Sequence, residues 1–188
     1  MITQTYSDIV TPELLKGAIE NNEYQGFRED YHVLHCLIRK YQPTSLFEIG
    51  TNMGTGTNII CNAGKSWIIK VYSLDLPTEL AHISLQHPIS EGKEDKVGMN
   101  CKFGYTQLRG DSMKFDFSQY PCDAYFIDGE HDKEHVERET YKACAYAKLI
   151  IWHDADIEGV WHGIESGLSS YYKLYRVTDT RIAYALRK

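Results

Sequence analysis

The feature that most constrains the fold is a glycine-rich turn directly after a short apolar segment, in the stretch SLFEIGTNMGTGTNII (residues 45–60). The apolar segment contains one acid, Glu48, and the glycines that follow have the spacing G-x-x-x-G-x-G. An amphipathic stretch then begins. This order predicts a buried strand, a turn and a helix, the arrangement with which α/β proteins bring their backbone close to a nucleotide-like ligand.

The rest of the chain alternates between apolar segments of strand length and amphipathic segments of helix length. We expect strands at residues 45–49, 67–75, 104–109, 124–128, 149–153, 173–177 and 181–186. We expect helices from residue 12, at 30–41, 56–63, 79–85, 133–147 and 157–170, and a short turn after Asp111. The polar stretch at 88–101 reads as a surface insertion that could serve as a lid.

Five strand–helix alternations predict a doubly wound, mainly parallel sheet. The last two strands are joined only by the turn at residues 178–180. A connection that short requires an antiparallel pair. We therefore expect an α/β fold with seven strands, of which the last is antiparallel, in one domain made of a helical segment (1–43) and an α/β core (44–188).

Composition excludes several classes of protein. The 188 residues are 43% hydrophobic and 24% charged, as in ordinary globular domains, and suffice for one substantial core. The net charge of −6 disfavours a nucleic-acid surface, because phosphate binding needs a basic face. We find no apolar run long enough for a membrane span and no secretory signal. Five scattered cysteines without a CxxC pair fit reduced thiols, so we expect a cytoplasmic protein with no membrane partner.

Two familiar glycine-loop templates fail at this turn. A dinucleotide site needs G-x-G-x-x-G, which the spacing does not provide. A P-loop needs G-x-x-x-x-G-K-[ST]; Gly64, Lys65 and Ser66 supply its end, but Ile59 stands at its first position. Asp75 ends the next strand, where an acid can accept hydrogen bonds from both ribose hydroxyls. The remaining candidate is a ligand that carries an adenosyl group.

A second group of polar residues follows two later strands. Asp128 ends the strand expected at 124–128 and His131 follows it; His153 ends the strand expected at 149–153, and Asp154 and Asp156 follow it. Ligands of open α/β sheets bind at the carboxyl ends of the strands. We therefore expect these side chains to meet at one rim of the sheet and to be functional.

The segment from His131 to His135 also matches H-x-x-E-H, an inverted zinc-protease motif. That motif needs both histidines inside one helix. Here His131 directly follows a strand and the pair Asp128-Gly129, so it is expected in a turn. We therefore set the protease interpretation aside.

Together, EIGTNMGTGT, the strand end SLD, the segment RGDS and the pair FIDGEH/WHDAD resemble the class I S-adenosylmethionine-dependent methyltransferases. The resemblance covers residues 45–156 and is strongest to a subgroup of small-molecule and sugar O-methyltransferases and cephalosporin-hydroxylase-like proteins. It implies a Rossmann-like fold and S-adenosylmethionine as cofactor. By this resemblance the cofactor would be bound by Glu48, Gly50, Thr51, Asn52, Gly54, Gly56, Thr57, Asp75, Asp111 and Ser112.

Several relatives of this kind bind a divalent metal at the matching strand ends. The resemblance therefore nominates Asp128 and Asp154, with His153 or Asp156 as a third ligand of Mg²⁺. Catechol-type enzymes carry Asp-Asn where this chain has His153-Asp154, so deprotonation with and without a metal both stay open. Without a metal, His131 or His153 would be the general base, because a neutral imidazole can take a hydroxyl proton.

The sequence thus predicts a methyltransferase that acts on the oxygen of a small hydroxylated molecule or sugar. The competing hypothesis is a non-catalytic module that keeps the same fold for cofactor binding or assembly. A small-molecule acceptor is the expected partner. The sequence does not indicate an oligomeric state.

Overall fold

The computed structural model of the 188-residue chain is described here for residues 1–19, 28–67, 70–77 and 96–188. Its centre is one eight-stranded sheet with the order β1-β7-β8-β6-β5-β2-β3-β4. The strands are β1 (Ile2–Gln4), β2 (Ser45–Ile49), β3 (Lys70–Asp75), β4 (Thr106–Arg109), β5 (Ala124–Ile127), β6 (Leu149–Trp152), β7 (Tyr172–Val177) and β8 (Ala183–Arg187).

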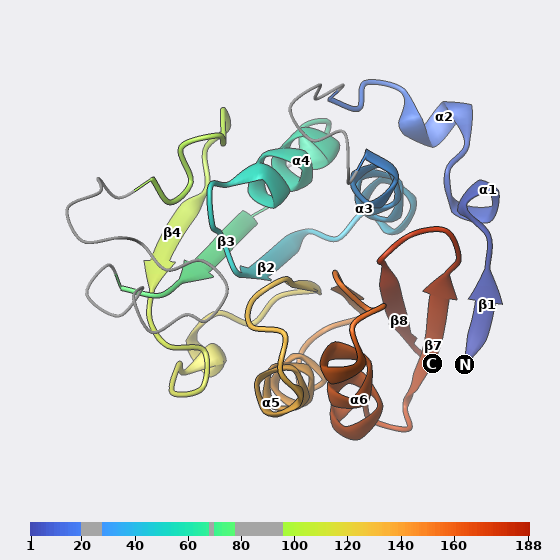
Figure 1. Cartoon of the computed structure of the whole chain (residues 1–188). Helices are drawn as coiled ribbons and strands as arrows, with labels where there is room; N and C mark the ends of the chain where they lie inside the picture. The colour runs from blue at the N-terminus through green and yellow to red at the C-terminus, as the bar shows by residue number, and fades with distance from the viewer. Residues whose placement is uncertain (20–27, 68–69, 78–95) are drawn as a thin grey trace.

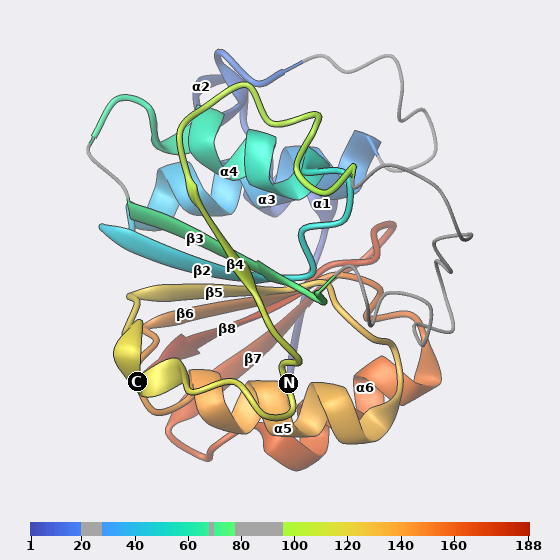
Figure 2. The ribbon, with the colours of Figure 1, turned by 90° about the vertical axis from the view of Figure 1, so that its left-hand side faces the viewer.

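Helices cover both faces of this sheet (Figure 2). They are α1 (Tyr6–Ile9), α2 (Pro12–Leu15), α3 (Arg28–Tyr41), α4 (Thr55–Gly64), α5 (Lys133–Ala143) and α6 (Glu158–Gly167), with a 3₁₀ turn at Phe117–Gln119. The helices α1–α4 lie on one side, whereas α5 and α6 lie on the other. The expected doubly wound α/β fold is confirmed.

The direction of the strands also agrees with the prediction. β2 pairs in parallel with both β3 and β5, and β5 pairs in parallel with β6. β8 is antiparallel to both of its neighbours, β6 and β7. The sheet has one strand more than expected, because β1 pairs in parallel with β7 at its edge. A three-residue strand inside the segment expected to be helical leaves almost no alternation to detect in the sequence.

Most of the expected helices and strands are present, and several are shorter than expected. The helix expected at 133–147 ends at Ala143, and the one at 157–170 ends at Gly167. The helix expected at 79–85 and most of the insertion at 88–101 lie outside the described residues. The described part, residues 96–101, packs on the glycine loop: the N–H groups of Gly98 and Asn100 donate to the carbonyls of Asn52 and Met53, both at 2.8 Å.

The hydrophobic core has two halves, one on each face of the sheet. Alternate residues of a strand point to opposite faces, so Leu46 packs with α3 and α4 while Phe47 packs with the opposite half. Val136 on α5 and Val160 and Ile164 on α6 belong to that opposite half. In the described residues, no helix has the length and apolar character needed to cross a membrane.

The contact between α5 and α6 depends on glycines where the helices touch. A Cβ atom built on Gly163 would lie 2.6 Å from the Val136 Cβ atom and 2.9 Å from the Lys133 carbonyl oxygen. Real Cβ atoms do not approach other atoms that closely. The two helices can therefore keep their spacing only with glycine at this position.

We expect Gly163→Ala to lower the free energy of unfolding by about 1–2 kcal/mol in urea denaturation, because overpacking outweighs the roughly 1 kcal/mol by which alanine is the better helix former. Gly104→Ala is the control, since a Cβ there meets nothing within 4 Å. An equal change in both variants would contradict this account of the α5–α6 contact.

Candidate functional site

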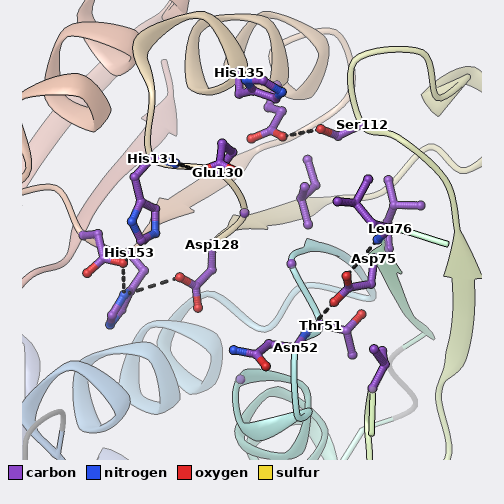
Figure 3. Close-up of a pocket in the computed structure, with 18 of the residues that line it drawn as sticks. Thr51, Asn52, Asp75, Leu76, Ser112, Asp128, Glu130, His131, His135 and His153 are labelled. Carbon is purple, nitrogen blue, oxygen red and sulfur yellow. Dashed lines mark hydrogen bonds and ion pairs between the residues drawn. The ribbon is translucent and has the colours of Figure 1, made fainter. Parts of the chain in front are cut away.

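A cavity of about 500 Å³ lies at the carboxyl ends of the central strands. Its wall is formed by residues that follow β2, β3, β4, β5 and β6, together with residues of α3 and α5. The predicted site residues that line it are Gly50, Thr51, Asn52, Gly56, Asp75, Asp111, Ser112, Asp128, His131, His153 and Asp154. Glu48, Gly54 and Thr57 do not line it. The side chains gather in three corners, which Figure 3 shows.

The glycine loop forms the first corner. Gly50 has a φ of +94°, and a side chain there would collide with the carbonyl oxygen of Asp128. Gly54 has a φ of +86° and lies against the backbone of Gly98. These two glycines are therefore required where the loop touches other backbone, in addition to any approach to a ligand.

Glu48 lies beneath this loop and is 1% exposed. Its Oε2 atom accepts hydrogen bonds from the hydroxyls of Thr57, at 2.5 Å, and Ser73. Gln107 extends the network, since its side-chain N–H groups donate to Thr51 Oγ1 at 2.9 Å and to the Ser73 carbonyl at 3.0 Å. Burial raises the pKa of Glu48 to about 8 in spite of these hydrogen bonds. Glu48 therefore supports the loop from below in a mainly neutral state at pH 7.

Asp75 ends β3 at the wall of the same corner. Its Oδ2 accepts a hydrogen bond from the Asn52 N–H at 2.6 Å, and its Oδ1 accepts one from the Leu76 N–H at 2.7 Å (Figure 3). Backbone contacts thus hold the carboxylate against the cavity. This is the position expected of an acid that accepts hydrogen bonds from a ribose.

The second corner combines the loop after β4 with α5. Asp111 caps its own loop: its carboxylate accepts a hydrogen bond from the Met113 N–H at 2.9 Å and pairs with Lys114 at 3.2 Å. Ser112 donates a hydrogen bond of 2.6 Å to Oε1 of Glu139, a residue of α5 that is 1% exposed. Burial raises the pKa of Glu139 to about 8.

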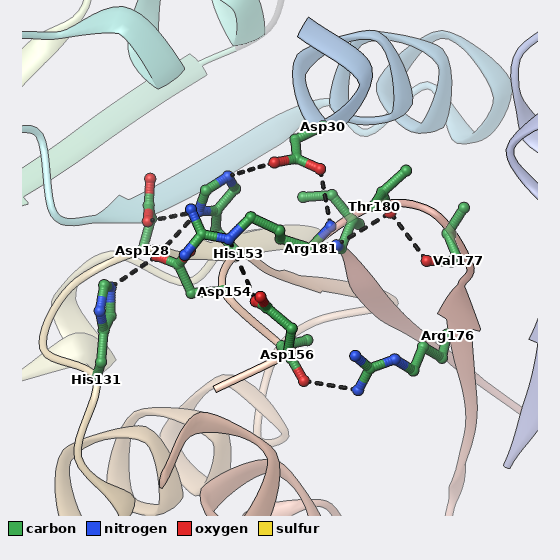
Figure 4. Close-up of polar contacts among 12 residues, drawn as sticks. Asp30, Asp128, His131, His153, Asp154, Asp156, Arg176, Val177, Thr180 and Arg181 are labelled. Carbon is green, nitrogen blue, oxygen red and sulfur yellow. Dashed lines mark hydrogen bonds and ion pairs between the residues drawn. The ribbon is translucent and has the colours of Figure 1, made fainter. Parts of the chain in front are cut away.

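The third corner is a cluster of charged groups around His153 (Figure 4). Its Nε2 lies 3.2 Å from an oxygen of Asp30, and its Nδ1 lies 3.4 Å from Asp128 and 3.1 Å from Asp154. Burial of the ring disfavours a charge, but the three carboxylates outweigh it and raise the pKa of His153 to about 12. The ring is therefore an imidazolium at neutral pH. Because both of its nitrogens then carry a proton, the ring cannot accept another. Its surroundings therefore do not support the predicted role as general base.

Asp154 connects this imidazolium to two further groups. His131 Nε2 lies 2.8 Å from Asp154 Oδ2, and Arg181 pairs with the other oxygen. Burial opposes the charge of Asp154, but its contacts with His131 and His153 hold its pKa well below the usual range. His131, with 20% of its side chain exposed, lines the cavity.

The nominated metal ligands are only partly brought together. Asp128, His131 and Asp154 each place one ligand atom within 4.8 Å of the others. His131 thus takes the place in this group for which His153 or Asp156 was nominated. Asp156 does not line the cavity and pairs with Arg181 at 3.2 Å, with about half of its side chain exposed.

Other residues of the cavity were not predicted. Arg181 lines the cavity just before β8; Asp30, which begins the buried face of α3, does not line it but contacts His153. An antiparallel β8 begins where β6 ends, so the predicted hairpin could have placed Arg181 at this rim. Glu139 had a sequence signal as well: it is an acid on the face of α5 that buries Val136, Thr140 and Ala143.

The expected roof of the site and the H-x-x-E-H segment can both be compared with the structure. Tyr31 lines the cavity and stacks on His153, with ring centroids 6.2 Å apart; Tyr24 and Phe27, which were considered with it as a roof, lie outside the described residues. His131 precedes α5, whose N-cap is Asp132, while His135 lies within the helix and pairs with Asp132 at 2.6 Å. The H-x-x-E-H segment therefore lacks the helical geometry that a zinc protease needs.

The buried Glu48 makes stability depend on pH. A carboxyl with a pKa of about 8 in the fold and 4.5 outside it binds its proton more tightly when folded. Its contribution to stability is therefore complete below about pH 4.5 and is lost as the pH rises toward 8. Glu48→Gln keeps the shape without the titration, so its free energy of unfolding relative to wild type should rise by about 4 kcal/mol between pH 5 and pH 8.5.

Urea denaturation at both pH values measures this difference. Glu165→Gln, which changes an exposed acid of α6, is the matched control and should track wild type at both. Parallel pH profiles for Glu48→Gln and wild type would show that Glu48 is already ionised in the fold.

The fold and the site can now be compared with known proteins. No protein-family model matches the sequence, and no curated protein sequence matches it either. Among solved structures, it is similar to an O-methyltransferase from Bacillus cereus in complex with SAH (S-adenosylhomocysteine): the TM-score is 0.60, with 16% identity over 88% of this chain and 84% of that one.

Two further structures show how widely the fold is used. An SAH-bound methyltransferase from Podospora anserina has a TM-score of 0.57 and 9% identity, over 94% of this chain and 85% of that one. The pre-rRNA processing protein fibrillarin from Methanococcus jannaschii has a TM-score of 0.53 and 11% identity, over 77% of this chain and 66% of that one. At such identities the likeness concerns the fold, which is that of the class I S-adenosylmethionine-dependent methyltransferases.

Proposed function

We propose that this protein transfers a methyl group from S-adenosylmethionine to a hydroxyl oxygen of a small molecule such as a sugar or natural product. The observation that carries the proposal is a single cavity that joins the glycine loop and Asp75 to a separate corner of carboxylates and imidazoles. Its volume of about 500 Å³ falls in the range of roughly 300–1,000 Å³ typical of small-ligand sites. The similar fold of an SAH-bound O-methyltransferase supports the choice of cofactor.

The first corner would bind the donor. Asp75 would accept hydrogen bonds from the ribose hydroxyls, and the loop from Gly50 to Gly56 would surround the amino-acid part of the cofactor. Glu48 lies under Gly56, where a Cβ atom would come within 2.6 Å of its Oε1. It therefore acts through the loop, as a positioning residue.

The third corner would bind and deprotonate the acceptor. The new bond forms between the acceptor oxygen and the methyl carbon while the bond from that carbon to sulfur breaks, and the hydroxyl proton passes to His131. Asp154, 2.8 Å from His131 Nε2, orients this ring and stabilises the charge that it gains. Most of the acceleration would come from holding the three reacting atoms in line and away from water.

The Asp128, His131 and Asp154 group also fits a divalent cation by distance, since its ligand atoms lie within 4.8 Å of one another. When bound, such an ion would polarise the acceptor hydroxyl and favour its deprotonation. Holding it requires His131 Nε2 without a proton. The imidazole departs from the all-oxygen surroundings that Mg²⁺ prefers, so Mn²⁺ is the better probe.

Calorimetric titration with S-adenosylhomocysteine tests the cofactor. We expect the wild-type protein to bind it, and Asp75→Ala to weaken binding by about 10- to 100-fold, because hydrogen bonds to a charged group contribute about 1.5–3 kcal/mol. Asp156→Ala is the matched control, since it removes a carboxylate of the same rim that does not line the cavity. It should change the affinity less than twofold.

Absence of binding to the wild-type protein at millimolar ligand would contradict the proposed cofactor. Equal losses in the two variants would contradict the role of Asp75. Repeating the titration with EDTA and with Mn²⁺ separates cofactor binding, which should not need a metal, from binding of the ion itself.

A further inference from the structure

A buried carboxyl group stands without a full set of partners at the second corner of the cavity. Glu139 lines the cavity from α5 and is 1% exposed. Ser112 satisfies its Oε1 atom with a hydrogen bond of 2.6 Å. Its Oε2 atom is buried and has no hydrogen-bond partner in the described part of the chain. Buried polar atoms are nearly always paired, so this one needs a partner that the described residues do not supply.

The surroundings of Glu139 determine which kind of partner fits. Asp111 after β4, Glu130 after β5 and Asp132 before α5 all oppose a negative charge there, and burial opposes it more strongly. His135, one turn earlier on the helix, is paired with Asp132 at 2.6 Å. Burial, helped by the three carboxylates, raises the pKa of Glu139 to about 8 against the effect of the Ser112 hydrogen bond, so the group is mainly a neutral acid at pH 7.

The hydrogen bond from Ser112 then assigns the proton of this acid. Oε1 accepts from the serine hydroxyl, so it is the carbonyl oxygen of the acid. The proton belongs on Oε2, which thereby becomes a buried donor without an acceptor. Oε1 has a second lone pair and can accept one more hydrogen bond.

Such a group presents one donor beside one acceptor. Adenine presents the complementary pair, because its amino group is a donor and each ring nitrogen next to that position is an acceptor. An ionised carboxylate would present two acceptors, which match the neighbouring N–H groups of guanine instead. The Gly129 backbone forms the adjacent wall, and a Cβ there would lie 3.6 Å from Oε1, in van der Waals contact with the carboxyl group.

We propose that Glu139, oriented by Ser112, is the group that recognises adenine in this cavity. Its Oε2 atom donates a hydrogen bond to a ring nitrogen, and its Oε1 atom accepts one from the amino group. This inference rests on the proposed function, because the adenine belongs to S-adenosylmethionine. It assigns the specificity for adenine to a residue in the middle of a helix. That residue lies outside every sequence motif that indicated the cofactor.

Calorimetric titration with S-adenosylhomocysteine between pH 6.5 and 9.5 tests this assignment. Wild-type affinity should fall above pH 8 and approach a tenfold loss per pH unit, because ionised Glu139 has lost its donor. Glu139→Gln presents the same donor and acceptor as the neutral acid. Its affinity should be within about threefold of that of the wild-type protein at pH 7, and it should not decrease at high pH. Glu139→Leu should bind at least tenfold more weakly at pH 7.

Thermal melts establish that each variant is folded at the pH of the titration. Ser112→Ala is a second, milder change: it should weaken binding several-fold and keep the fall at high pH. Wild-type affinity in Glu139→Leu would overturn the proposal, and so would an unchanged pH profile in Glu139→Gln. If the wild-type protein binds no S-adenosylhomocysteine at any pH, the proposed function itself is overturned. That result differs from binding whose affinity is the same in the wild-type protein and in the variants at residue 139.

Discussion

The site depends on a ladder of backbone hydrogen bonds that continues past the carboxyl ends of the strands. The N–H groups of Gly50 and Asp128 donate to the carbonyls of Leu74 and Ile49, both at 2.9 Å, and the N–H of His153 donates to the Ile127 carbonyl at 3.1 Å. Each strand end is thereby tied to its neighbour, so the residue that follows it has one possible position. The missing side chain of Gly50 completes the constraint, since any Cβ there would collide with the Asp128 carbonyl.

The charges of the acceptor corner follow from this arrangement. Parallel strands deliver Asp128 and Asp154 to adjacent positions, and α3 adds Asp30 from above. Three carboxylates so close together need cations, which His153 and Arg181 provide. His153 therefore neutralises the carboxylates of this corner, and our proposal gives the role of general base to His131, which pairs with Asp154. Glu48 and Glu139 differ from these acids: neither forms an ion pair within the described part of the chain, and burial keeps both mainly neutral at pH 7.

The parallel strands, the helices α4, α5 and α6 and the antiparallel last strand could be predicted from the sequence, because hydrophobic periodicity and connection length determine them. Asp75, Asp128, His131 and Asp154 could be predicted as well, since each follows a recognisable strand. The ion pairs of His153 and the burial of Glu48 could not, because both depend on side chains from distant elements. Glu139 is an acid on the buried face of a predicted helix, which marks it as unusual, but only the three-dimensional packing shows that it faces the cavity. The short strand β1 has too few residues to carry a periodic signal.

A crystal structure of the protein with S-adenosylhomocysteine tests the account most directly, because it assigns all three corners at once. The account predicts the adenine beside Ser112 and Glu139, the ribose hydroxyls within hydrogen-bond distance of Asp75, and the sulfur facing the corner of Asp128 and His131. A ligand bound outside this cavity would contradict it. So would a ligand in the cavity with its adenine at the acceptor corner.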